Sequence, residues 1–187
     1  MRLLLLAPPG AGKGTQAEGL AARYALTDIS SGELLREHIA QGTPIGRHVA
    51  AALEAGDLVA DELVLAVLSV PLVSAALDGG YVLDGFPRTV AQAEMADRLL
   101  APLGQSFQAA VTLDVEHDEL IRRLGARRHG RPYDDPVVVR HRIEVYDRLT
   151  SPLLAYYDEK GILVRVDGMG TSAEVAARID DALAHLT

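Results

Sequence analysis

The chain has 187 residues, 49% of them hydrophobic, which is enough for one substantial core and too short for two typical domains. Its formal net charge of −8 argues against a protein that coats nucleic acid, and the lack of cysteine excludes disulfides, thiolate metal sites and cysteine nucleophiles. The apolar start MRLLLL is shorter than a signal-peptide core or a membrane span, so we expect a cytoplasmic protein that binds no membrane.

Short, nearly continuous apolar runs alternate with longer amphipathic segments along the chain. Such runs are typical of strands that are buried on both faces of a parallel sheet. We expect strands at residues 2–7, 27–29, 80–84, 109–114 and 162–166. We expect helices at residues 13–24, 31–41, 44–55, 61–77, 89–100, 116–125, 137–159 and 171–186, with Ser30, Asp61, Thr89 and Thr171 at helix starts. This order predicts an α/β three-layer fold in which helices flank a five-stranded parallel sheet.

Two segments do not fit a simple alternation of strands and helices. Residues 30–77 are largely helical and too long for one crossover, which indicates an inserted subdomain. The stretch GARRHGRPYDDP contains several glycine and proline breakers and is rich in Arg and Asp, which indicates an exposed loop that could act as a lid.

The stretch APPGAGKGT (residues 7–15) follows the first strand and opens the first helix. Its glycines let backbone N–H groups face inward, and the helix N-terminus adds positive potential, so the stretch can bind an anion. Lys13 can reach terminal phosphates, and Thr15 can place its hydroxyl near a magnesium ion. A strand–helix turn that uses glycine only for its conformational freedom is the alternative interpretation.

PPGAGKGTQ resembles the phosphate loop of adenylate kinases and their nucleoside-monophosphate kinase relatives. Ala7 stands where that family usually has glycine, and its methyl group should be tolerated if its φ is negative. The resemblance implies a P-loop NTPase-type fold in one kinase domain, residues 1–187, with an NMP-binding segment at 30–59 and a short lid at 126–136. The ATP-binding residues implied by this loop are Gly10, Ala11, Gly12, Lys13, Gly14 and Thr15.

Two further stretches resemble the part of the family that holds the acceptor nucleotide. ISSGELLRE has a serine, Ser31, where adenylate kinases usually have threonine; it keeps the hydroxyl and favours adenine, because pyrimidine-preferring relatives tend to have alanine there. EAGDLVADELV resembles the segment whose backbone lines the acceptor base, with Ala60 in place of the usual proline. The AMP-binding residues implied by these stretches are Ser31, Arg36, Asp57, Leu58 and Val59.

YVLDGFPRTVAQAE is the most specific match. In the family, its arginine binds the acceptor phosphate, its glutamine reads the adenine edge and its aspartate orients magnesium through water. These residues are Arg88, Gln92 and Asp84 in this chain. The resemblance also places Gly85, Phe86 and Pro87 in the AMP site.

Arginine supplies sixteen of the 18 basic residues, and eight of these arginines fall between residues 122 and 148. A solvated helix face would explain this cluster, and so would a grip on a compact polyanion. ELIRRLGARR, GRPYDD, VVVRHRIEVYDRLTSPLLAYY and RVDGMGT resemble the family's lid region, the helix that reaches the transferred phosphate and the loop behind the ATP base. The resemblance implies ATP binding by Arg123, Arg127 and Gly170, AMP binding by Arg131 and Arg142, a lid carboxylate at Asp134 or Asp135, and solvated or structural roles for Arg122, Arg128, Arg140 and Arg148.

The resemblance implies a monomeric enzyme that reversibly transfers the γ-phosphoryl group of Mg-ATP to AMP and gives two ADP. Positioning and positive charge would carry the reaction, with closure of the lid to exclude water. Mg²⁺ is the expected cofactor, and a short lid without cysteine implies no structural zinc. Two alternatives remain: a UMP/CMP kinase, against which Ser31 and Gln92 argue, and an ATP-binding regulatory module that has lost catalysis. The implied catalytic residues are Lys13, Arg88, Arg123, Arg131 and Arg142.

Overall fold

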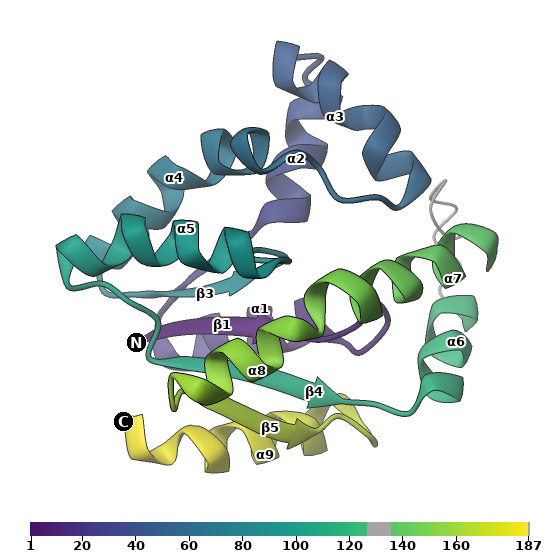
Figure 1. The fold of residues 1–187 in the computed structure, drawn as a ribbon. Coiled ribbons are helices and arrows are strands. Elements are labelled where there is room, and N and C mark those ends of the chain that lie inside the picture. The colour runs from purple at the N-terminus through teal and green to yellow at the C-terminus, as the bar shows by residue number, and fades with distance from the viewer. Residues whose placement is uncertain (127–135, 187) are drawn as a thin grey trace.

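A parallel five-stranded sheet forms the centre of the computed structural model, which describes residues 1–126 and 136–186 (Figure 1). The strands lie in the order β2-β3-β1-β4-β5. They span Arg2–Leu6 (β1), Thr27–Ser30 (β2), Tyr81–Asp84 (β3), Ala109–Asp114 (β4) and Leu163–Asp167 (β5). All five predicted strands are confirmed, each within one residue at either end.

The helices follow the predicted order. They span Lys13–Tyr24 (α1), Ser31–Ala40 (α2), Pro44–Ala55 (α3), Asp61–Leu77 (α4), Val90–Leu100 (α5), His117–Ala126 (α6), Pro136–Val145 (α7), Pro152–Glu159 (α8) and Ser172–Leu183 (α9). Side-chain oxygens of Ser30, Thr89 and Thr171 cap α2, α5 and α9 as predicted, whereas α4 begins at Asp61 with Ala60 as its N-cap. Within the described ranges, no helix is both long and apolar enough to cross a bilayer.

The single helix predicted over residues 137–159 is wrong. The structure divides it into α7, a π-helical turn at Tyr146–Thr150 and α8. Pro152 lacks an N–H group and its ring crowds the preceding turn, so the α-helical ladder cannot run through it. The N–H of Ser151 instead donates to the carbonyl oxygen of Tyr146, five residues back, at 2.9 Å.

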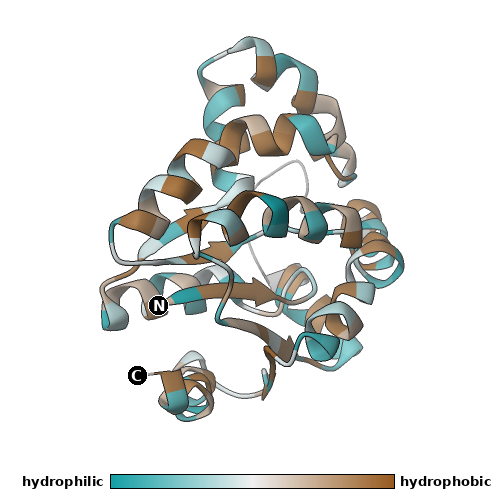
Figure 2. Cartoon of the chain, turned by 60° about the vertical axis from the view of Figure 1, so that its left-hand side comes forward, coloured by the Kyte–Doolittle hydropathy of each residue, from teal (hydrophilic) through white to brown (hydrophobic). Residues whose placement is uncertain are grey.

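Two apolar clusters cover the two faces of the sheet and confirm the three-layer arrangement. Leu4 and Leu6 face the cluster that includes α4, α5 and α8, whereas Leu3 and Leu5 face the cluster that includes α1, α6 and α9. This alternation explains why the first strand is a continuous leucine run, since each leucine is buried on one face or the other. Figure 2 shows hydrophobic colour along the strands of the sheet.

The register brings the carboxyl ends of three strands side by side. Asp84 at the end of β3 pairs with Leu5 of β1 and with Ser30 of β2. The connection after β1 leads to β2 on one side of the sheet, and the connection after the neighbouring β3 leads to β4 on the other side. The carboxyl edge between β1 and β3 is therefore the kind of point where open α/β sheets bind ligands. In Figure 1, α2 and α3 project above this edge, and α6 and α7 lie beside it.

Candidate functional site

The loop between β1 and α1 has the geometry that its glycines predict. Gly10 and Gly12 have φ values of 89° and 95°, in the left-handed region that favours glycine. A Cβ atom on Gly10 would also lie 2.8 Å from the Leu124 Cγ atom of α6. The N–H of Ala11 donates to the carbonyl of Pro8 at 3.2 Å, which closes the turn just before α1 begins. The loop thus brings backbone N–H groups and a helix N-terminus to one place.

Lys13 folds back over this loop. Its Nζ atom donates to the carbonyl oxygens of Ala7, at 2.7 Å, and Pro8, at 3.3 Å. Ala7 is 4% exposed, and among the described residues only Ala25 is a non-glycine residue with positive φ. The backbone at Ala7 therefore accepts the methyl group that departs from the family pattern.

A pocket of about 530 Å³ opens beside the loop, at the carboxyl edge of the sheet. This volume is typical of a small-molecule site. Its walls come from the phosphate loop, α2, the segment after α3, the end of β3 and α7. The predicted site residues that line it are Gly10, Gly12, Lys13, Gly14, Thr15, Ser31, Arg36, Asp57, Leu58, Val59, Asp84, Gly85, Arg88, Gln92 and Arg142.

Cationic side chains enter the pocket from different elements. Arg36 comes from α2, Arg88 from the turn after β3 and Arg142 from α7. The Nε atom of Arg88 donates to the carbonyl of Gly85 at 2.8 Å, and this hydrogen bond fixes the orientation of the guanidinium group. Burial lowers the pKa of Arg88, the nearby charge of Arg36 lowers it further, and Asp84 opposes both effects. An anion in the pocket would relieve the cost of burying these charges.

Contacts between α7 and the segment after α3 close one wall of the pocket. The Nε2 atom of His141 and the Oδ1 atom of Asp57 are 2.6 Å apart. Gly56 packs against Arg142, and a Cβ atom there would lie 2.7 Å from the Arg142 Cγ atom. The helix that carries Arg142 therefore touches the segment that is predicted to hold the acceptor base.

Asp84 has the properties expected of a magnesium-orienting carboxylate. Its Oδ1 atom is buried and has no hydrogen-bond partner among the described residues. A buried carboxylate oxygen is costly unless a donor or a cation satisfies it, so magnesium or its bound water fits this position. Within residues 1–126 and 136–186, no group of three or more His, Cys, Asp or Glu side chains could hold a metal. Magnesium does not need one, because it usually binds one or two carboxylates together with substrate phosphates.

Asp28, which the sequence analysis did not single out, lies in β2 and also lines the pocket. Partial burial raises its pKa to about 6, and the charges of Glu33, Asp84 and Glu18 act in the same direction. A charged residue in a short strand just before the SSGE stretch was the only sequence signal for it. The pocket thus carries negative as well as positive groups on its walls.

We expect Asp28→Asn to stabilise the folded protein at pH 7.5 and to have no effect near pH 4. A carboxyl group whose pKa is raised by folding loses stability as the pH rises from its unfolded value, 3.8, through about 6. Full conversion of that shift would give about 3 kcal/mol, and solvent screening at this exposed side chain reduces it to about 1 kcal/mol. Thermal unfolding at the two pH values measures the effect, with Glu37→Gln on the exposed face of α2 as control. Equal stabilisation at both pH values would contradict the assignment.

Hydrogen bonds hold Gln92 firmly at the base of the pocket, where its side chain is 2% exposed. The Oε1 atom accepts from the backbone N–H of Arg88 at 2.7 Å, and the Nε2 atom donates to Asp61 Oδ1 at 2.6 Å. The hydroxyl of Thr150 donates to the carbonyl of Arg88 at 3.0 Å. The peptide unit of Arg88 is therefore fixed from two sides.

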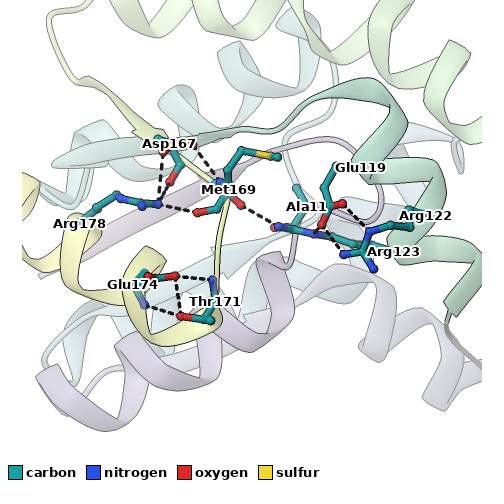
Figure 3. Close-up of polar contacts among 10 residues, drawn as sticks. Ala11, Glu119, Arg122, Arg123, Asp167, Met169, Thr171, Glu174 and Arg178 are labelled. Carbon is teal, nitrogen blue, oxygen red and sulfur yellow. Dashed lines mark hydrogen bonds and ion pairs between the residues drawn. The ribbon is translucent and has the colours of Figure 1, made fainter.

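Arg123 lies next to the phosphate loop but does not line the pocket (Figure 3). It donates to Glu119 at 2.6 Å and to the carbonyls of Gly168, at 3.1 Å, and Ala11, at 3.4 Å. Hydrogen bonds from Arg122 and Arg123 lower the pKa of the Glu119 carboxyl to about 2. Arg123 thus joins α6, the phosphate loop and the loop between β5 and α9.

Several predicted residues lie elsewhere. Gly170 is exposed in the loop before α9, and a Cβ atom there would crowd Glu174, which forms a capping box with Thr171 (Figure 3). Phe86 is fully buried in the core, and Pro87 lines a smaller cavity that also borders Arg142. The predicted residues that fall outside the described part of the chain are Arg127, Arg128, Arg131, Asp134 and Asp135.

The chain is similar to known proteins along nearly its whole length. The chain matches the family profile described as "Adenylate kinase" over residues 5–162. It is 45% identical to the adenylate kinase of Xanthomonas campestris pv. campestris (strain 8004), over 98% of this chain and 99% of that protein. It is 46% identical to that of Thermus thermophilus, over 97% of this chain and 96% of that protein. It is 47% identical to that of Synechococcus sp. RCC307, over 98% of each.

Proposed function

Since the chain belongs to the adenylate kinase family, it is an ATP:AMP phosphotransferase, and we propose that the pocket described above binds both of its nucleotides. Phosphoryl transfer needs two polyanions held in line and a transition state whose charge is stabilised. The observation that carries the proposal is the convergence of Lys13, Arg36, Arg88 and Arg142 on one pocket.

In this proposal, the donor ATP lies on the phosphate loop. Backbone N–H groups of residues 10–15 and the N-terminus of α1 hold its phosphates, and Lys13 leaves the carbonyls of Ala7 and Pro8 to reach them. Arg123 and the loop at Gly170 lie on the side of the phosphate loop where the rest of ATP would extend. Arg127 is assigned to the same nucleotide by the family resemblance alone.

The acceptor AMP lies between α2, the segment 57–59 and the turn after β3. Arg36 and Arg88 bind its phosphate, and Ser31, Val59 and Gln92, which line the pocket, surround its base. Ser31 and Gln92 are each 2% exposed, so the chain already holds them in place before a nucleotide binds. Arg142, which lines both cavities, lies between the two nucleotides in this proposal. Arginine suits these positions because its planar fork meets phosphate oxygens in pairs.

The reaction needs no general base, because the attacking phosphate oxygen is already anionic. The chain's part is to orient the two phosphates and to spread positive charge around the group in transfer. Bound magnesium, oriented by Asp84 and close to Thr15, would neutralise charge on the donor phosphates. Closure of the NMP-binding segment, 30–59, and the lid, 126–136, would exclude water, and Arg131 would enter with the lid. We further propose that the protein is a cytoplasmic monomer, as its resemblance to the family implies.

A product assay tests the proposal. Purified protein receives Mg-ATP with AMP, UMP, CMP or GMP in separate reactions, and a reaction with ATP alone is the control. Rapid ADP formation with AMP only is the expected result. Preference for a pyrimidine acceptor would overturn the acceptor assignment of Ser31 and Gln92. Hydrolysis of ATP alone at the rate of transfer would contradict closure, and ATP binding without transfer would point to a regulatory module.

A further inference from the structure

The side-chain amide of Gln92 is held in one orientation by two groups of opposite hydrogen-bonding character. The carboxylate of Asp61 contacts the Nε2 atom at 2.6 Å, and the backbone N–H of Arg88 contacts the Oε1 atom at 2.7 Å. An ionised carboxylate only accepts hydrogen bonds, and a backbone N–H only donates. Rotation of the amide by half a turn would oppose two acceptors at one end and two donors at the other. These neighbours therefore fix which end of the amide is nitrogen.

This fixed orientation determines which hydrogen bonds Gln92 can form with a ligand. The amide keeps one N–H on Nε2 and one lone pair on Oε1, and its side chain forms part of the pocket wall. An adenine edge matches this pair, because its N6 amino group donates and its N1 atom accepts. A hypoxanthine, guanine or uracil edge presents the reverse, with a carbonyl that accepts beside a ring N–H that donates.

We propose that Asp61 is a specificity-determining positioning residue, which selects a 6-amino over a 6-oxo purine by fixing the amide of Gln92. The inference rests on the proposed function, in that Gln92 faces the acceptor base. Asp61 suits the role because it is the first residue of α4, where the positive helix end favours a carboxylate. It also directly follows the segment 57–60, whose first three residues, Asp57, Leu58 and Val59, line the pocket.

Asp61→Ala tests the proposal with AMP and inosine monophosphate, which are nearly identical in shape and differ in the polarity of this edge. Without the carboxylate, only the backbone N–H of Arg88 still favours one orientation, so the amide turns at a lower cost and can meet either base. We expect KM for AMP to rise about tenfold with kcat nearly unchanged, and the ratio of kcat/KM for AMP to that for inosine monophosphate to fall about tenfold. Asp61→Asn should restore only part of the ratio, because its side-chain oxygen can accept from Nε2 but its amide can also turn and donate.

Glu62→Ala, which removes a carboxylate from the same turn of α4, is the matched control and should leave the ratio unchanged. KM for ATP and the thermal midpoint establish that each variant is folded. If KM for AMP rises but the ratio of kcat/KM for AMP to that for inosine monophosphate is unchanged, Asp61 has only a structural role and the proposal is overturned. Gln92→Ala distinguishes a failure of the Asp61 proposal from a failure of the acceptor-site assignment. If Gln92→Ala leaves both KM for AMP and the ratio unchanged, then Gln92 does not face the base and the acceptor assignment itself fails.

Discussion

Replacement of Arg88 by lysine is expected to lower kcat/KM for AMP by about 10²- to 10³-fold, which corresponds to about 2.7–4 kcal/mol of transition-state stabilisation. Arg88 uses its Nε atom to donate to the carbonyl of Gly85, and this leaves the two terminal nitrogens to face the pocket. A lysine has one ammonium group, which cannot keep the Gly85 contact and also bind phosphate oxygens in pairs. Lysine keeps the positive charge, so the loss in kcat/KM for AMP measures the contribution of the guanidinium geometry.

Steady-state kinetics with each nucleotide varied in turn would measure the effect of Arg88→Lys. KM for ATP should change by less than about threefold, since Arg88 lies on the acceptor side of the proposed site. Arg148→Lys is the matched control, because Arg148 is exposed in the π-helical turn and lines neither cavity. An equal loss with ATP and AMP would indicate general distortion of the phosphate-loop edge and contradict the assignment.

The strands and most helix starts could be predicted because local residue patterns determine them. Leu3 to Leu6 read as a strand buried on both faces, and the two apolar clusters bury them in this way. Ser30, Thr89 and Thr171 each carry an oxygen that caps the following helix, so their type marked the boundary. The phosphate-loop residues were found for the same reason, because their spacing within one short segment sets their geometry.

Contacts between distant segments could not be predicted in this way. Asp61 and Gln92 are 31 residues apart, and the tertiary fold brings them together by placing α4 and α5 in one apolar cluster. Asp28 became visible only when the sheet register placed β2 beside Asp84. The break before Pro152 had a local signal in the proline itself, which the prediction of one helix over 137–159 did not take into account. Sequence patterns therefore located the parts of the site, and the tertiary structure determined which side chains hold one another.

Substitution of Gly46 by alanine should destabilise the protein although it lies inside a helix, where alanine is normally the better residue. Gly46 is in the first turn of α3, and a Cβ atom there would lie 2.1 Å from the carbonyl oxygen of His38 in α2. That carbonyl accepts hydrogen bonds from the N–H and the hydroxyl of Thr43, which in turn caps α3. Neither backbone can move without breaking this turn, so we expect a loss of about 2 kcal/mol.

A shift at this turn should affect nucleotide binding as well as stability. It joins α2, which carries Arg36, to α3, which leads to the segment 57–59, so a shift of either helix displaces the proposed acceptor site. We expect the thermal midpoint to fall by about 4–8 °C and KM for AMP to rise about tenfold, with KM for ATP unchanged. Gly19→Ala is the matched control, because it lies inside α1 and a Cβ atom there would meet only the flexible end of Arg23; it should stabilise by about 0.5–1 kcal/mol. If Gly46→Ala also stabilised, α2 and α3 would have room to separate, and the close packing that orients Arg36 would not be required.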